Sequence, residues 1–269
     1  MRGVIVASVM ACLSLGAAAQ ESALERLSTS DATRGWEAVG RINIGDSGFC
    51  TGTLIANDLV LTAAHCLYDP DTYAPLPPES FQFLAGWRNG RAAAYRGVRR
   101  AVPHPDYFYE GRDRMDRVAY DLALLELDQP IRLPSIHPFA IGGDPQAGDA
   151  VGVVSYALDR AEAPSLQETC HVLGRQPGIL VMTCDVDSGS SGAPIFTLQD
   201  GRPTIVSVVS AKAEMDAKPV ALGTAMEQPM AELRAAYSAQ ERTFRGVTAG
   251  LGKSGPGAAG DGGAKFLKP

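Results

Sequence analysis

The chain has 269 residues, of which 45% are hydrophobic and 20% charged, so it can bury a sizeable core and is not a disordered chain. Its 30 acidic residues outnumber 24 basic ones, and the net charge of -6 disfavours a nucleic-acid partner. No apolar run reaches the roughly 18 to 20 residues of a membrane span. The five cysteines do not resemble a metal site, because no two of them form a CxxC pair. We therefore expect no nucleic acid, no stable membrane insertion, no metal and no other cofactor.

Residues 1–19 have the layout of an export signal: Arg2, then an apolar stretch to about Leu15, then small residues ending at Ala19. A lipid-attachment box before Cys12 remains an alternative. Removing these residues leaves four cysteines, and an even number in an exported chain predicts two disulfides. We expect a secreted or periplasmic protein.

Residues 20–35 are predicted to form a leader or an N-terminal arm, and residues 36–245 the folded domain. That domain contains short β-type runs, for example 38–44, 50–55, 59–62, 81–87, 122–127, 150–156, 179–184 and 204–209. Turn residues separate them, as at 45–48, 69–71, 142–145 and 200–201. Short strands without alternating helices predict an all-β barrel or sandwich.

The end of the domain changes character. Met230, Leu233 and Tyr237 recur at helical spacing, which predicts a helix over 227–242 packed against the barrel. From residue 246 to 269 the chain is rich in Gly and Ala, and we predict a flexible tail.

Three segments carry candidate catalytic residues, namely Leu61–Cys66 with His65, Asp121–Leu127, and Asp187–Ile195 with Ser191. They resemble the TAAHC, D-[IL]-A-L-L and G-x-S-G-x-P blocks of the trypsin/chymotrypsin-like serine peptidases, in the order His, Asp, Ser. The resemblance implies two six-stranded antiparallel Greek-key barrels with the active site in the cleft between them. The order His, Asp, Ser excludes an α/β-hydrolase, which needs Ser, Asp, His.

The resemblance also implies a role for each residue. Ser191 would attack the peptide carbonyl, because a serine hydroxyl becomes a useful nucleophile only beside a base. His65 would be that base and then the acid for the leaving amine, and Asp121 would orient the imidazole. The amides of Gly189 and Ser191 would form the oxyanion hole.

The same resemblance implies a Cys50–Cys66 disulfide beside the catalytic histidine, which leaves Cys170 and Cys184 as the second pair. The remaining histidines are interpreted as structural, and His104 is placed in a surface loop. They are His104, His137 and His171.

The chain departs from the animal trypsins at Ser190, where those enzymes carry the Asp that receives a freed N-terminal ammonium. A neutral hydroxyl cannot form that ion pair. We therefore expect activity without cleavage after Arg34, which is the basic residue in the leader that could serve as an activation cleavage site. The missing Asp and the 70-residue spacing from Asp121 to Ser191 are more similar to the bacterial glutamyl-endopeptidase branch. Glutamate specificity is not supported, because Val209 occupies the position of that branch's pocket histidine.

The predicted primary pocket consists of Asp185, Val209, Ser210 and Ala211. Asp185, at the base, favours Arg or Lys before the scissile bond. Because Lys212 could neutralise Asp185 or narrow the entrance, aliphatic, aromatic and acidic side chains remain open.

We therefore expect an exported, monomeric serine endopeptidase that acts on protein or peptide substrates through an acyl-enzyme. The alternative is a catalytically inactive binding protein on the same fold.

Overall fold

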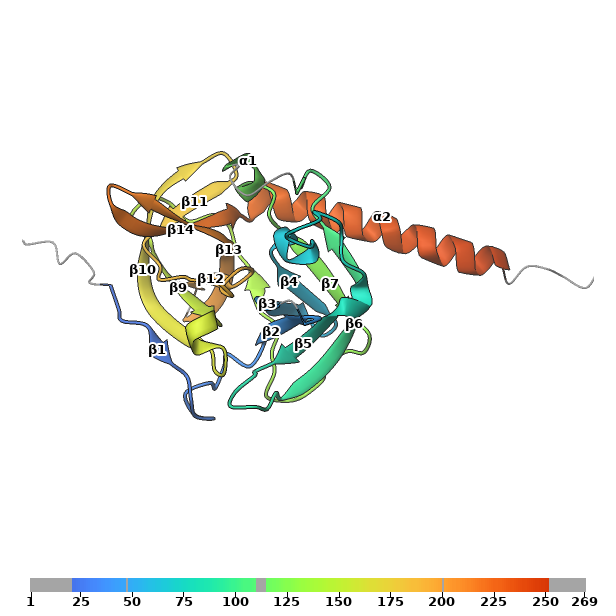
Figure 1. Ribbon diagram of the computed structural model, residues 1–269, viewed down its shortest axis with the longest axis horizontal. Coiled ribbons are helices and arrows are strands. Elements are labelled where there is room, and N and C mark those ends of the chain that lie inside the picture. The colour runs from blue at the N-terminus through green and yellow to red at the C-terminus, as the bar shows by residue number, and fades with distance from the viewer. Residues whose placement is uncertain (1–20, 47, 110–114, 200, 252–269) are drawn as a thin grey trace, which may run out of the picture.

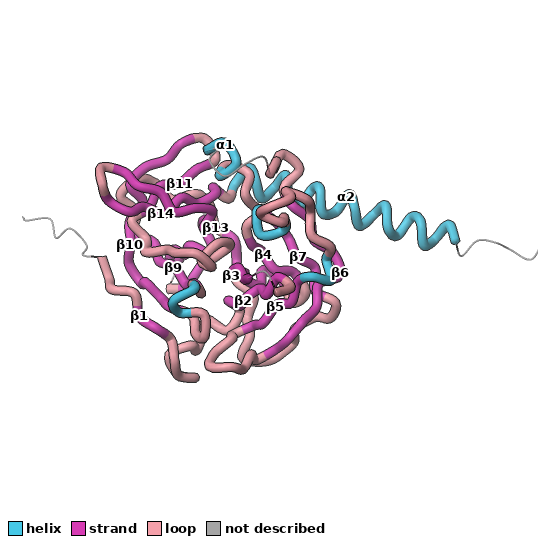
Figure 2. Tube along the Cα trace, viewed as in Figure 1, coloured by secondary structure: helices cyan, strands magenta, loops and turns pink. Residues whose placement is uncertain are grey.

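The computed structural model describes residues 21–46, 48–109, 115–199 and 201–251, so the predicted export signal lies outside the described residues. Figures 1 and 2 show a body built mostly of strands in two lobes, with one long helix along the top. No helix within the described ranges is long and apolar enough to cross a membrane.

The first lobe is a closed barrel in the order β2-β3-β4-β7-β6-β5. Every neighbouring pair is antiparallel, and the register of β2 on β3 runs from Val39 opposite Thr53 to Ile44 opposite Gly48. The strands are β2 (Val39–Ile44), β3 (Gly48–Ala56), β4 (Leu59–Thr62), β5 (Phe81–Ala85), β6 (Ala94–Pro103) and β7 (Ala123–Leu127).

The second lobe follows the order β10-β11-β14-β13-β12-β9 and closes because β9 also pairs with β10. Two short strands add to its outside, β1 antiparallel to β10 and β8 parallel to β13. The prediction of two six-stranded antiparallel barrels is confirmed. The strands are β1 (Glu25–Arg26), β8 (Ala140–Ile141), β9 (Ala150–Ser155), β10 (Ser165–Gln176), β11 (Ile179–Met182), β12 (Pro194–Gln199), β13 (Arg202–Met215) and β14 (Lys218–Ala225).

Helical segments are few and short, apart from one. They are η1 (Ala64–Leu67), η2 (Pro78–Ser80), η3 (Leu158–Arg160), α1 (Met115–Val118) and α2 (Glu227–Leu251). Of these, η1 directly follows β4 and η3 follows β9, so both lie at ends of barrel strands.

One hydrophobic core fills the first barrel and continues between the lobes. It includes Phe83 and Leu124 from the first barrel and Val154, Tyr156 and Val208 from the second. Burial of such side chains contributes about 1.5–3 kcal/mol each, so the shared core holds the two lobes together.

Helix α2 starts at Glu227, as predicted, and docks through its apolar side: Met230 and Leu233 are buried. The Arg100 guanidinium lies 3.9 Å from the Tyr237 ring centroid and adds a cation–π contact. The helix continues to Leu251, beyond the predicted end at residue 242 and into the region predicted as a tail. Figure 1 shows its far end projecting past the first barrel, and residues 252–269 lie outside the described residues.

The predicted leader or arm begins as an extended segment against the second barrel and continues as turns over residues 30–35. Glu25 and Arg26 pair with β10, and Leu27 is buried. The Arg88 guanidinium of the first barrel binds the Thr33 hydroxyl at 2.8 Å. The arm therefore contacts both lobes.

Candidate active site

His65 and Asp121 both come from the first barrel. His65 lies on η1, just after β4, and Asp121 lies just before β7, which pairs with β4. The antiparallel pairing brings the end of one strand beside the start of the other. The His65 Nδ1 atom is 2.7 Å from Asp121 Oδ2, and the His65 backbone N–H donates to Oδ1 at 2.8 Å.

The Asp121 carboxylate is buried, with 2% of the residue exposed. A carboxylate only accepts hydrogen bonds, so the imidazole hydrogen lies on Nδ1 and the neutral ring keeps its lone pair on Nε2. The Ser210 hydroxyl of β13 also donates to Oδ2. The second barrel thus helps to hold a carboxylate of the first.

The net effect of these surroundings on the His65 pKa is upward. Burial lowers the pKa, while the charge and hydrogen bond of Asp121 raise it more strongly and the Arg117 charge lowers it slightly. The pKa therefore lies above the ordinary value of 6.5.

Ser191 lies in the loop before β12, in the second barrel. Its backbone carbonyl accepts the Thr51 N–H of β3 at 2.8 Å, and the Gly192 N–H donates to Val209 O at 2.8 Å. Gly192 has a φ of +80°, and a Cβ there would collide with Thr62 and Ala63, which immediately precede η1. Glycine is required by both the backbone angle and the close approach. The Ser191 loop therefore packs against the segment that leads into His65.

The amides of this loop fall into two groups. The N–H groups of Ser190, Gly192 and Ala193 donate to Asp187 O, Val209 O and Ser190 O respectively. Those of Gly189 and Ser191 donate to no acceptor among the described residues. Two backbone donors left open beside a serine are what an oxyanion site needs.

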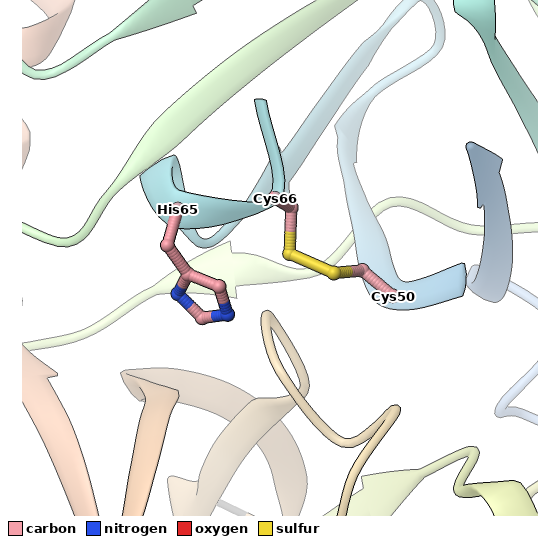
Figure 3. Close-up of side chains that lie close together, drawn as sticks. All are labelled: Cys50, His65 and Cys66. Atoms are coloured by element: carbon pink, nitrogen blue, oxygen red, sulfur yellow. A yellow bond between two sulfur atoms is a disulfide. The ribbon is translucent and has the colours of Figure 1, made fainter. Parts of the chain in front are cut away.

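Both predicted disulfides are present, Cys50–Cys66 and Cys170–Cys184, each with an S–S distance of 2.00 Å. Figure 3 shows His65 and Cys66 on the same short helix, with the disulfide leading from Cys66 to Cys50 beside the imidazole. These three residues are close enough to suggest a metal site. Because the two sulfurs are bonded to each other, neither is a thiolate ligand.

The residues predicted for the primary pocket have different surroundings in the structure. Val209 is buried in the second-barrel core with Val186 and Ala221, and Ser210 faces Asp121. Asp185 is exposed, and its backbone N–H donates to the Gln167 side chain at 2.7 Å.

Lys212 lies on β13 after Ser210 and Ala211, and Ala211 packs against a small hydrophobic cluster around Val220. The Lys212 Nζ atom is 3.8 Å from Asp187 Oδ2, an exposed pair that links β13 to the nucleophile loop. The lysine therefore pairs with Asp187, whereas the sequence suggested Asp185.

His104 is buried, with 1% of the residue exposed, although its motif suggested a surface loop. Its Nδ1 accepts the Asp106 N–H at 3.1 Å, and its Nε2 is 3.2 Å from Glu232 of α2. These three residues could approach a metal ion. The Nδ1 lone pair is already used, so the arrangement fits a structural contact between the β6 end and α2.

Comparison with known proteins identifies the family and the fold. The family model described as Trypsin matches residues 28–227. The chain belongs to the trypsin family. It is thus a member of the trypsin-like serine proteases, in which the disulfide-bonded members are typically extracellular.

Curated relatives of this trypsin-family chain include Serine protease 23 of Mus musculus, 30% identical over 174 residues, which are 57% of this chain and 44% of that protein. Glutamyl endopeptidase of Bacillus licheniformis is 25% identical over 156 residues, 58% of this chain and 47% of that protein. The chain spans less than half the length of these relatives.

A solved structure described as Glu endopeptidase in complex with MPD superposes with a TM-score of 0.67 at 19% identity, covering 82% of this chain and 98% of that one. This likeness establishes the fold, and the predicted resemblance to the bacterial branch is confirmed.

Proposed function

We propose that the protein is an exported serine endopeptidase that hydrolyses peptide bonds with His65, Asp121 and Ser191. The observation that carries the proposal is that two features lie side by side, because the Ser191 loop packs against the segment leading into His65. The His65–Asp121 pair leaves Nε2 as a base, and the adjoining Ser191 loop leaves two amides open.

The proposed reaction has two halves. Ser191 Oγ attacks the substrate carbonyl and gives its proton to His65 Nε2, and the amides of Gly189 and Ser191 bind the resulting oxyanion. When the C–N bond breaks, His65 returns the proton to the leaving amine and an ester on Ser191 remains. Water then attacks this acyl-enzyme by the same route, and Asp121 stabilises the imidazolium in both halves.

The proposed substrates are proteins or peptides, with a preference for a basic side chain on the residue before the scissile bond. Asp185, six residues before Ser191, would provide the charge. Its exposure and the pairing of Lys212 with Asp187 leave its carboxylate free of that cation.

Export is proposed from residues 1–19 and is supported by the two disulfides, which form in oxidising compartments. The protein would act as a monomer in the periplasm or outside the cell.

The test is hydrolysis of fluorescently labelled casein by the purified chain. The wild type should release peptides with or without EDTA, and Ser191→Ala should not. An inactive trypsin-fold binding protein would give no release from either variant while both show the same thermal unfolding.

A further inference from the structure

Arg160 is a buried cation at the end of η3, with 8% of the residue exposed. Its Nη2 donates to the Ser155 hydroxyl at 3.0 Å and to the Ser190 hydroxyl at 3.4 Å. Ser155 and Ser190 are both fully buried.

The charge of Arg160 is poorly compensated. Within the described part of the chain, its ion pair is with the neighbouring Asp159, whose side chain is 73% exposed, at 3.3 Å. Its Nε is buried and has no hydrogen-bond partner there. Burying a cation whose buried partners are hydroxyls and whose one carboxylate partner is exposed is costly, so packing does not explain an arginine at this position.

Ser190 is the residue immediately before the nucleophile. Its hydroxyl donates to Tyr156 O at 3.2 Å, accepts the Asp187 N–H at 3.2 Å, and accepts from Arg160. The Leu158 N–H donates to Ser188 O at 2.8 Å. The loop that carries Ser191 therefore packs against residues 156–160, and Arg160 links that segment to the loop through Ser190.

These contacts fix the direction of the open amides. The Ser188 carbonyl and the Gly189 N–H belong to one planar trans peptide unit and point in opposite directions, so the Leu158 bond aims the Gly189 N–H away from η3. The Ser190 carbonyl accepts the Ala193 N–H at 2.9 Å. Because the Ser191 N–H belongs to the same peptide unit as this carbonyl, the bond fixes the direction of that N–H as well.

We propose that Arg160 is a positioning residue for the oxyanion hole. Its guanidinium holds Ser190 and residues 156–160 together, so that the Gly189 and Ser191 amides stay convergent without any cation supplied by a freed N-terminus. The inference rests on the proposed peptidase function.

The experiment compares kcat and KM of the full chain with those of Arg160→Ala on one fluorogenic peptide. Loss of oxyanion alignment acts in the transition state, so kcat should fall by about a hundredfold while KM changes by less than about threefold. Methylguanidinium added to Arg160→Ala should refill the site and restore at least a tenth of the lost kcat.

Arg100→Ala is the matched control. The Arg100 side chain is only 12% exposed, but it contacts Glu126 and Tyr237, which are distant in sequence from the Ser191 loop. It should lose thermal stability, keep its kcat and show no response to methylguanidinium. Ser190→Ala is the second variant, and it tests the same contact should Arg160→Ala not fold. Its kcat should fall by about tenfold at unchanged KM.

A kcat within twofold of the wild type in Arg160→Ala or Ser190→Ala would overturn the inference. So would a loss of kcat that follows the unfolded fraction and is not restored by methylguanidinium. A wild-type chain that is folded but hydrolyses nothing overturns the proposed function itself, and this inference with it.

Discussion

The Asp121 carboxylate accepts three hydrogen bonds, from the His65 amide, the His65 ring and the Ser210 hydroxyl. Three donors from two barrels hold one small carboxylate, so its orientation is set by the fold. The chemistry of the site follows from this, since the carboxylate decides which imidazole nitrogen carries the hydrogen.

Replacing Asp121 by Asn tests that role. An amide can present N–H to the ring and favour the wrong tautomer, so Asp121→Asn should lower kcat by roughly four orders of magnitude. The measurement is steady-state kinetics on a fluorogenic peptide, with unfolding curves to confirm an intact fold. A loss smaller than about tenfold would remove Asp121 from the mechanism.

The pH profile tests the state of His65. The ring must be neutral to accept the Ser191 proton, and its pKa is raised above 6.5 because Asp121 outweighs the burial that lowers it. Activity should therefore fall as the pH drops, with the midpoint of kcat/KM above 6.5. A plateau that continues well below pH 6.5 would contradict the assignment of His65 as the base.

The sequence predicted some residues of the site and not others. His65, Asp121 and Ser191 lie in contiguous motifs, whose signal is local. Arg160 belongs to no recognisable sequence motif, because its contact with Ser190, 30 residues along the chain, depends on how the chain places η3 beside the Ser191 loop. Ser210 was expected in the substrate pocket, and alternation along β13 turns its hydroxyl to Asp121 while Val209 enters the core.

At the scale of elements, two charged or titratable side chains of the first barrel, Arg100 and His104, add to the apolar docking of α2. The Arg100 side chain binds Glu126 and covers Tyr237, and the buried His104 faces Glu232. The His104 contact depends on pH because burial lowers the pKa of the ring, against the opposing influence of Glu232 and Asp106.

The sign of this pH dependence can be worked out. A histidine with a lowered pKa in the fold takes up its proton more readily when unfolded, so its contribution to stability is complete above pH 6.5 and declines as the pH falls through 6.5. The Tm should drop more between pH 7.5 and 5.5 in the wild type than in His104→Asn. Equal decreases in Tm in the two proteins would show that protonation of His104 does not destabilise the fold.

The strands β6, β10 and β14 were not predicted from the sequence, and there is a physical reason for this. The turn between β13 and β14 places Asp216 at a φ of 52° and Ala217 at 59°, a geometry that usually calls for Asn-Gly. Without glycine there, the hairpin has no local signal. The long strands β6 and β10 alternate buried and exposed residues irregularly, and bulges such as that between Gln167 and Cys170 break their period.

At the scale of the molecule, the proposed active site combines residues from both barrels. The first supplies His65 and Asp121, and the second supplies Ser191 and the open amides. The shared core and the arm contact both lobes. The loop that carries Ser191 is held by contacts of Ser188 and Ser190 with Tyr156, Leu158 and Arg160. We therefore expect the geometry of the proposed site to be complete once the chain has folded.

A chain that starts at Gln20 should accordingly be active without further cleavage. Ser190 cannot bind an ammonium as an ion pair, and Arg160 already occupies its hydroxyl. The measurement is peptidase activity of that chain beside a variant with Arg34→Gln, which blocks cleavage after a basic residue in the arm. Activity that appears only after cleavage near Arg34 would contradict a self-assembled oxyanion loop.

The central claim, that Ser191 is a nucleophile activated by His65, is tested most directly by covalent labelling. The folded chain is treated with a fluorophosphonate, digested, and analysed by mass spectrometry, with His65→Ala and Ser191→Ala in parallel. We predict one adduct on Ser191 in the wild type, labelling slower by at least about a thousandfold in His65→Ala, and none in Ser191→Ala. A wild-type chain with both disulfides formed that carries no adduct on Ser191 would contradict the account.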